Sequence, residues 1–213
     1  MKKIVLMVMI ALAGVKGFAQ SEKYTAAMKA NLAALDTSFK NPANLLAVAN
    51  NFERIAMAEK TQWLPYYYAA YCQVNYGFFE QDKTKVDAIA NKAGELISKA
   101  DALNLNNSEI SCIKSMIATC HLMVNPMQRF MEYGQESAQH MEEAMRQDPA
   151  NPRPYLLKGQ NLKFTPEQFG GGCGTAKPEL QTALDKFVTF KPASELHPNW
   201  GKAHTEELMK DCK

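Results

Sequence analysis

The sequence predicts an all-α protein built from antiparallel helix pairs, and three observations support this fold class. Apolar residues recur at steps of three and four over most of the chain, which is typical of helices that bury one face. Pairs of small residues, seven positions apart, return at an almost constant distance along the chain. No segment shows a convincing alternation of apolar and polar residues, so strands are not expected.

The expected helices are separated by breaks rich in proline, glycine and asparagine. In chain order they cover 21–35, 44–59, 63–79, 86–103, 109–123, 127–147, 154–163, 177–190 and 200–212. Pro65 and Pro154 stand in first turns, where a proline is tolerated. The helix over 127–147 has the most regular pattern, and we expect Met131 and Met141 on its core face.

The joint between the sixth and seventh helices, at 142–159, is the clearest in the sequence. The sixth helix is stopped by Pro149 and Pro152, because each proline fixes φ and disfavours helix in the residue before it. Small residues seven apart mark this joint and three others: Ala49 and Ala56, Ala93 and Ala100, Ser137 and Ala144, and Ala176 and Ala183. The second members follow one another at intervals of roughly 40 residues, which indicates a structural repeat.

Ala144, followed five residues later by Pro149 and then by Tyr155 and Gly159, resembles the junction of a tetratricopeptide repeat. In that family the alanine lets two helices approach closely and the proline closes the second helix. The resemblance implies antiparallel helix pairs stacked as a right-handed solenoid, with the short helix at 200–212 capping the end. The repeat interval here exceeds the family's period of about 34, which implies insertions between paired helices.

Three further segments, NPRPYLLKGQN, TPEQFGGG and FKPASELHPNWGK, resemble small secreted tetratricopeptide-type proteins of Gram-negative bacteria. This resemblance implies a fold and a location, and it supplies no catalytic residues. No GxSxG motif is present either, so we expect a protein that is not an enzyme.

The N-terminus has the pattern of a secretory signal peptide. Lys2 and Lys3 precede a short apolar run, and Gly17-Phe18-Ala19 is a small-x-small cleavage site. We therefore expect a signal peptide at 1–19 and one helical-repeat domain at 20–213, located in the periplasm. No membrane anchor is expected after cleavage, and the alternative is that the signal stays uncleaved as an anchor.

The charge balance argues against nucleic acid as a partner. The chain has 24 basic and 22 acidic residues. The expected signal contains Lys2, Lys3 and Lys16 and no acid, so the rest of the chain is close to neutral. A chain without a basic excess has little attraction for nucleic acid or anionic lipid.

Aromatic residues are concentrated in the third expected helix, over 63–79. They occupy more sides of the helix than one core face can bury. In tetratricopeptide arrays the first helix of each pair lines a groove, so we expect Trp63, Tyr66, Tyr67 and Tyr71 to bind an unidentified protein or peptide there. The alternative is that these side chains pack against the N-terminal helix pair.

A second function is a small-ligand or soft-metal (copper) binding protein. Six soft or borderline ligands are close in sequence, namely Met116, Cys120, His121, Met123, Met127 and Met131. Methionine on a patterned helix face more often fills a core, so no metal or cofactor is assigned.

Five cysteines leave at least one without a partner. Cys72, Cys112 and Cys120 lie within expected helices among apolar residues, which favours buried free thiols. Cys173 lies in a glycine loop and Cys212 near the chain end, where a bond distorts no helix. We expect a disulfide between Cys173 and Cys212, since the predicted compartment is oxidising.

Overall fold

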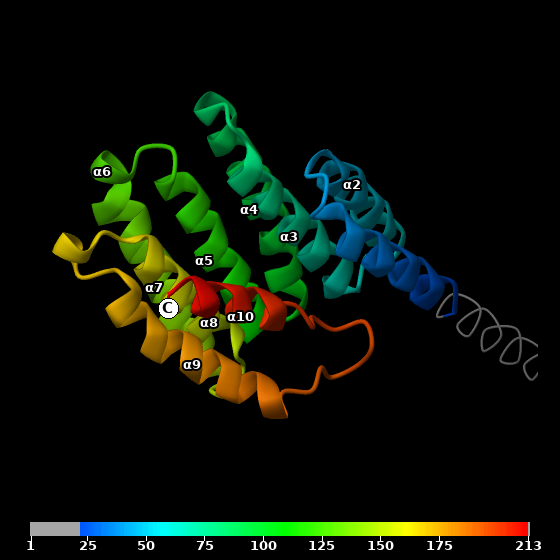
Figure 1. The fold of residues 1–213 in the computed structure, drawn as a ribbon. Coiled ribbons are helices and arrows are strands. Elements are labelled where there is room, and N and C mark those ends of the chain that lie inside the picture. The colour runs from blue at the N-terminus through cyan, green and yellow to red at the C-terminus, as the bar shows by residue number, and fades with distance from the viewer. Residues whose placement is uncertain (1–21, 213) are drawn as a thin grey trace, which may run out of the picture.

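The computed structural model describes residues 22–212, and within this range every regular element is a helix (Figure 1). The predicted all-α class is confirmed. The expected signal peptide at 1–19 lies outside the described residues. Among the helices of 22–212, none combines the length and the apolar character needed to cross a membrane.

The observed helices agree closely with the predicted ones. The chain is helical over 22–38. The elements that follow are α2 (Ala43–Ala58), α3 (Trp63–Phe79), α4 (Lys83–Leu103), α5 (Ser108–Leu122), α6 (Pro126–Arg129), the π-helix η1 (Phe130–Gly134), α7 (Gln135–Gln147), α8 (Arg153–Phe164), the 3-10 helix η2 (Glu167–Phe169), α9 (Cys173–Thr189) and α10 (Lys202–Asp211). Asp82 and Asn107 cap α4 and α5 by accepting backbone N–H bonds.

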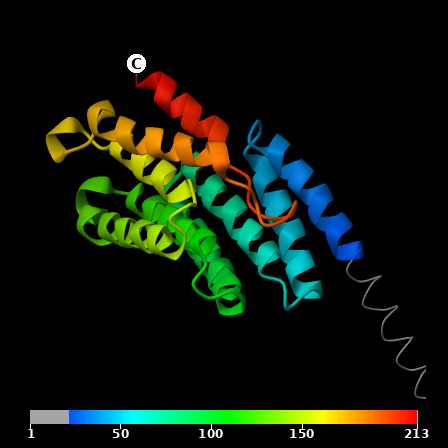
Figure 2. The ribbon, with the colours of Figure 1, turned by 90° about the horizontal axis from the view of Figure 1, so that it is seen from below.

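From α2 onward, each long helix packs against the next one in the chain, and α3 also contacts α5 (Figures 1 and 2). The residues at the predicted joints all lie at these contacts in buried positions: Ala49, Ala56, Ala93, Ala100, Ser137, Ala144, Ala176 and Ala183. Small side chains let neighbouring helices approach closely, so a larger residue there would overpack the crossing.

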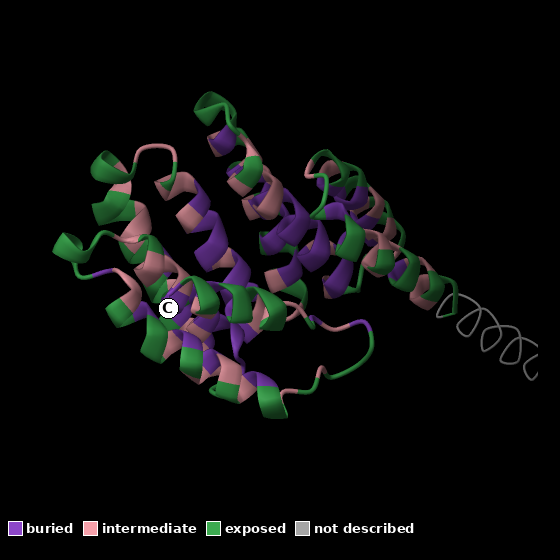
Figure 3. Cartoon of the chain, viewed as in Figure 1, coloured by how far each residue is buried: buried purple, intermediate pink, exposed green. Residues whose placement is uncertain are grey.

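Buried apolar residues form two clusters. The larger extends from the 22–38 helix to α7 and also includes Leu157 of α8 and Leu196 from the segment between α9 and α10. The smaller joins α8, α9 and α10. Figure 3 shows the buried positions on the facing sides of the helices. Trp200 packs against both clusters and therefore links the last helices to the rest of the array.

The helix predicted over 127–147 is present as a continuous helical run over 126–147, but it contains a π-helical turn that was not predicted. In chain order the run consists of α6, η1 and α7. The wider π turn shifts the helical register, so Met131 faces solvent, contrary to the prediction, whereas Met141 is buried as expected. A Cβ at Gly134 would lie 3.0 Å from the Phe130 ring, so a larger residue there would require the ring to shift.

Residues 190–201 connect α9 to α10 without regular structure, and we call them the C-terminal strap. A disulfide joins Cys173 and Cys212, the expected pair, with the Cα atoms 5.2 Å apart. Cys173 is the first residue of α9 and does not lie in the preceding loop. The bond therefore fastens the end of α10 to the start of α9. Cys72, Cys112 and Cys120 are free and buried.

Candidate functional site

The aromatic face of α3 is covered by the chain itself. Tyr67 and Tyr71 are buried, and Trp63 and Tyr66 are partly buried. The prediction of exposed groove residues is therefore wrong for Tyr67 and Tyr71. The physical reason is that the C-terminal strap lies across this face, as the orange segment beside α3 shows (Figures 1 and 2).

The strap is seated on α3 by aromatic and polar contacts. The Trp200 indole stacks on Tyr71 with ring centroids 4.9 Å apart and planes inclined by 29°. Its Nε1 donates a 2.8 Å hydrogen bond to the Tyr67 hydroxyl. The Tyr68 hydroxyl donates to the carbonyl of Leu196 at 2.9 Å. The Tyr71 ring face and the Tyr67 hydroxyl, which were expected to bind a partner, therefore contact the strap instead.

The other two predicted groove residues lie to either side of these contacts. Trp63 meets His197 of the strap edge-on, with ring centroids 5.8 Å apart. Tyr66 faces the Lys99 ammonium on α4 at 5.9 Å instead. The structure thus brings Trp63, Tyr67 and Tyr71 together beneath the strap. Tyr66 lies outside that contact.

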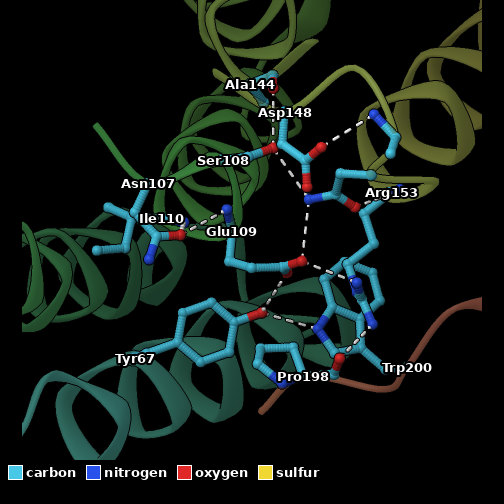
Figure 4. A network of polar contacts seen from close by, with 12 residues as sticks. Tyr67, Asn107, Ser108, Glu109, Ile110, Ala144, Asp148, Arg153, Pro198 and Trp200 are labelled. Carbon is cyan, nitrogen blue, oxygen red and sulfur yellow. Dashed lines mark hydrogen bonds and ion pairs between the residues drawn. The ribbon is translucent and has the colours of Figure 1, made fainter. Parts of the chain in front are cut away.

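A buried ion pair between Arg153 and Glu109 anchors the strap (Figure 4). Arg153 Nη1 lies 2.8 Å from Glu109 Oε1, and Nη2 donates a 2.7 Å bond to the carbonyl of Pro198. The guanidinium group also lies over the rings of Phe190 and Trp200, 4.7 and 5.1 Å from their centroids. One arginine therefore connects α5, α8 and the strap.

The surrounding polar groups complete this network. Glu109 accepts hydrogen bonds from Asn151 at 2.9 Å and from the Tyr67 hydroxyl at 3.3 Å. Burial raises the pKa of Glu109, and the nearby Arg153 charge and hydrogen bonds oppose that effect. Burial likewise raises the pKa of Tyr67 well above its ordinary value. Apart from Arg153 Nε, which is buried without a hydrogen-bond partner, these groups are paired with one another, so the network holds the strap.

Six exposed apolar side chains lie on two segments, 123–131 after α5 and 164–169 at the end of α8 and after it. We call this surface the exposed apolar end, and its residues are Met123, Met127, Phe130, Met131, Phe164 and Phe169. Met127 is 81% exposed and Met131 is 69% exposed. A group of exposed apolar side chains at one end of a protein commonly marks a binding site.

Two chain segments contribute to the exposed apolar end. The Asn161 side-chain amide lies 3.4 Å from the Thr119 hydroxyl and 3.3 Å from the Ser137 hydroxyl. These contacts bring the C-terminal end of α8 to α5 and α7. Figures 1 and 2 both place α6 and the segment after α8 at the same end of the molecule.

A polar cluster adjoins this surface. Both terminal nitrogens of Arg129 donate to the Asp87 carboxylate, at 2.7 and 2.8 Å, and His121 Nδ1 lies 2.8 Å from the same carboxylate. The Tyr133 ring stacks on His121 with centroids 4.9 Å apart. The Arg129 hydrogen bonds, together with those of His121, hold the pKa of Asp87 at about 2, although partial burial opposes this.

The soft ligands expected from the sequence do not share one surface. Met116 and Cys120 belong to the core, whereas Met127 and Met131 are exposed. Over 22–212, no group of three or more histidine, cysteine or acidic side chains is placed to hold a metal ion.

Sequence reasoning missed both polar clusters. Arg129 follows Asp87 by 42 residues, and Arg153 follows Glu109 by 44. These separations are close to the repeat interval of the alanine joints, so equivalent positions in successive helix pairs face each other. Oppositely charged residues one repeat apart were therefore the signal that could have found them.

The comparisons with known proteins agree with this architecture. No protein-family model matches the chain, and no curated protein matches it. Among solved structures, the HusA haemophore from Porphyromonas gingivalis is similar, with a TM-score of 0.80 and 35% sequence identity. The match covers 89% of this chain and 92% of that one. At this identity and coverage, the chain belongs to the same family as the HusA haemophore.

Proposed function

We propose that this chain is a non-catalytic binding protein that takes up haem or a related porphyrin outside the inner membrane. The observation that carries the proposal is the relationship to a haemophore over nearly the whole of both chains. The expected signal peptide at 1–19 supports the location. The exposed apolar end is the surface on which we place the ligand.

The residues of this surface fit a porphyrin. The macrocycle is flat and largely apolar, so its faces gain free energy when they leave water. Met127, Phe130 and Met131 present apolar and polarisable side chains on adjacent helical turns. Methionine adapts its shape and makes favourable contacts with aromatic rings.

Binding of a protein or peptide is the second candidate function. The strap on α3 supports it, because this face already accommodates an extended segment through stacking and main-chain hydrogen bonds. A partner on that face would have to displace the strap, which the Arg153 network opposes. The exposed apolar end needs no such displacement, so we favour the porphyrin.

Titration of the chain from residue 20 onward with hemin tests the proposed function. We expect a saturable shift of the Soret absorption band at a fixed stoichiometry. The double variant Met127→Ser/Met131→Ser should bind hemin at least about tenfold more weakly. Each methionine that the ligand covers contributes on the order of 1.5–3 kcal/mol to the free energy of binding.

The matched control is Met57→Ser, because Met57 is 62% exposed on α2, away from this surface. The control should bind hemin like the unmodified chain. An unchanged Soret band in the unmodified chain, or equal losses in the control and the double variant, would contradict the proposal.

A further inference from the structure

The π turn η1 changes which residue of the helical run over 126–147 faces α5. In α7, Ser137 and Ala144 mark the buried side, since both are almost fully buried and the Ser137 hydroxyl bonds to that of Ser115 on α5. Seven residues make nearly two turns of an α-helix, so a regular helix would carry this buried side back to Phe130. Phe130 is instead 52% exposed.

Arg129 occupies the inward place that Phe130 leaves. Its two terminal nitrogens donate to Asp87 of α4 at 2.7 and 2.8 Å, and Nη1 also donates to the carbonyl of His121 in the last turn of α5 at 3.0 Å. A π turn contains one residue more than an α turn, so it rotates the preceding segment by about one residue position. The turn therefore replaces an aromatic ring by a guanidinium group where this segment meets α4 and α5.

The two helical registers compete for the same inward place. In the π register Arg129 forms a bidentate, charge-assisted pair with Asp87, and its guanidinium also lies 5.7 Å from the centre of the Tyr133 ring. In a regular α register Phe130 would gain free energy by leaving water, and the Arg129 pair would be lost. Because π turns are rare in helices, the pair supplies the reason that this one persists.

We propose that Arg129 and Asp87 are positioning residues of the exposed apolar end. Their ion pair holds η1 in the π register and so keeps the Phe130 ring turned outward, beside Met127 and Met131, for the porphyrin. This inference rests on the proposed function. Without either partner, the run relaxes toward a regular α-helix, Phe130 turns toward α5, and the apolar surface shrinks.

Thiol labelling measures the register without any ligand. The native cysteines of 22–212 are either buried or joined in the Cys173–Cys212 bond, so an introduced thiol is the reactive one. A maleimide should label Phe130→Cys rapidly, and Phe130→Cys/Arg129→Ala at least about tenfold more slowly, since cysteine readily occupies a buried place.

The matched control for labelling is Phe164→Cys, at a position 71% exposed at the end of α8 and outside the run. Its labelling rate should be the same with and without Arg129→Ala, which also shows that the variant folds. Equal rates for Phe130→Cys in the two backgrounds would overturn the assignment of Arg129 to the register.

Hemin titration measures the consequence for binding. Arg129→Ala and Asp87→Asn should each weaken hemin binding at least about tenfold, because Phe130 leaves the surface. If Arg129 contacted a ligand carboxylate directly, Asp87→Asn would free the guanidinium and strengthen binding, and that result would overturn the proposal. The control is Lys114→Ala, which breaks another ion pair between α4 and α5, with Asp101, and should bind hemin like the unmodified chain.

The two measurements separate the possible failures. If the unmodified chain binds hemin, and Arg129→Ala changes neither the labelling rate nor the affinity, the positioning role is wrong and the proposed function stands. If labelling slows as expected but the unmodified chain does not bind hemin, the proposed function is wrong. The role of the pair in porphyrin binding then falls with it, and the register assignment stands.

Discussion

Trp200 Nε1 donates a 2.8 Å hydrogen bond to the hydroxyl of Tyr67 across 133 residues of sequence. The same hydroxyl lies 3.3 Å from Glu109, which is paired with Arg153. A residue near the C-terminal end thus completes a network that begins on α3. The strap is therefore an integral part of the fold.

Trp200→Ala should lower the free energy of unfolding by about 2–4 kcal/mol, because it removes a large, mostly buried ring and one hydrogen bond. Urea denaturation measures this change. The control is Val188→Ala, at a position 78% exposed on α9, which should change stability by less than about 0.5 kcal/mol. A similar small effect for Trp200→Ala would show that the strap is not needed for stability.

Arg153→Met should destabilise the fold by about 3–5 kcal/mol, because Glu109 would remain buried without its partner. The double variant Arg153→Met/Glu109→Gln should recover part of that loss, since the uncompensated charge is then gone. Chemical denaturation of the unmodified protein, Arg153→Met, Glu109→Gln and the double variant measures the coupling. Additive losses from the two single substitutions would mean that the two residues do not interact.

Asp87 should make stability depend on pH in the acid range. Its folded pKa of about 2 lies below the ordinary 3.8, so its ion cluster stabilises the fold above about pH 4 and loses that effect as pH falls toward 2. Because the side chain is partly exposed, we expect Asp87→Asn to cost only about 1 kcal/mol at pH 7. The difference in the free energy of unfolding between the unmodified protein and Asp87→Asn should shrink between pH 4 and pH 3. A difference that stays constant over this range would contradict the assigned role of Asp87.

Ala100→Leu and Ala144→Leu should each destabilise the protein by about 1–3 kcal/mol, since both alanines are fully buried at helix crossings. Thermal melting measures the effect. Ala88→Leu on α4 and Ala138→Leu on α7 are matched controls at exposed positions of the same helices. Equal melting temperatures in all four variants would show that Ala100 and Ala144 do not lie at close helix contacts.

Cys212→Ser should destabilise the fold by about 3–4 kcal/mol, the chain-entropy value for a closed loop of 39 residues. Melting curves with and without a thiol reductant measure it. The reductant should lower the melting temperature of the unmodified protein and leave that of the variant unchanged. Equal melting of both proteins under oxidising conditions would mean that the bond adds no stability.

The helices were predictable because their signals are local. Apolar spacing, prolines and small residues act within one or two turns, so most expected elements appear with bounds shifted by a few residues. The buried alanines were predictable for the same reason. A close helix crossing excludes large side chains wherever it occurs.

Contacts between distant segments were not predictable from these signals. Nothing in the composition of α3 shows that Trp200 will cover Tyr71, since aromatic residues suit both cores and binding surfaces. The π turn at Phe130–Gly134 was hidden as well, because its residues fit an ordinary helical pattern. That one turn moved Met131 from the expected core to the exposed apolar end.

The three buried cysteines constrain the order of events during maturation. Burial raises the pKa of Cys72, Cys112 and Cys120, so in the folded protein these thiols rarely form the reactive thiolate. Once the helices have packed, Cys173 and Cys212 are left as the reactive pair. An oxidant that acts before packing would meet five comparable thiols and could trap a wrong bond. Packing of the helical core before thiol oxidation therefore favours the Cys173–Cys212 bond over wrong pairings.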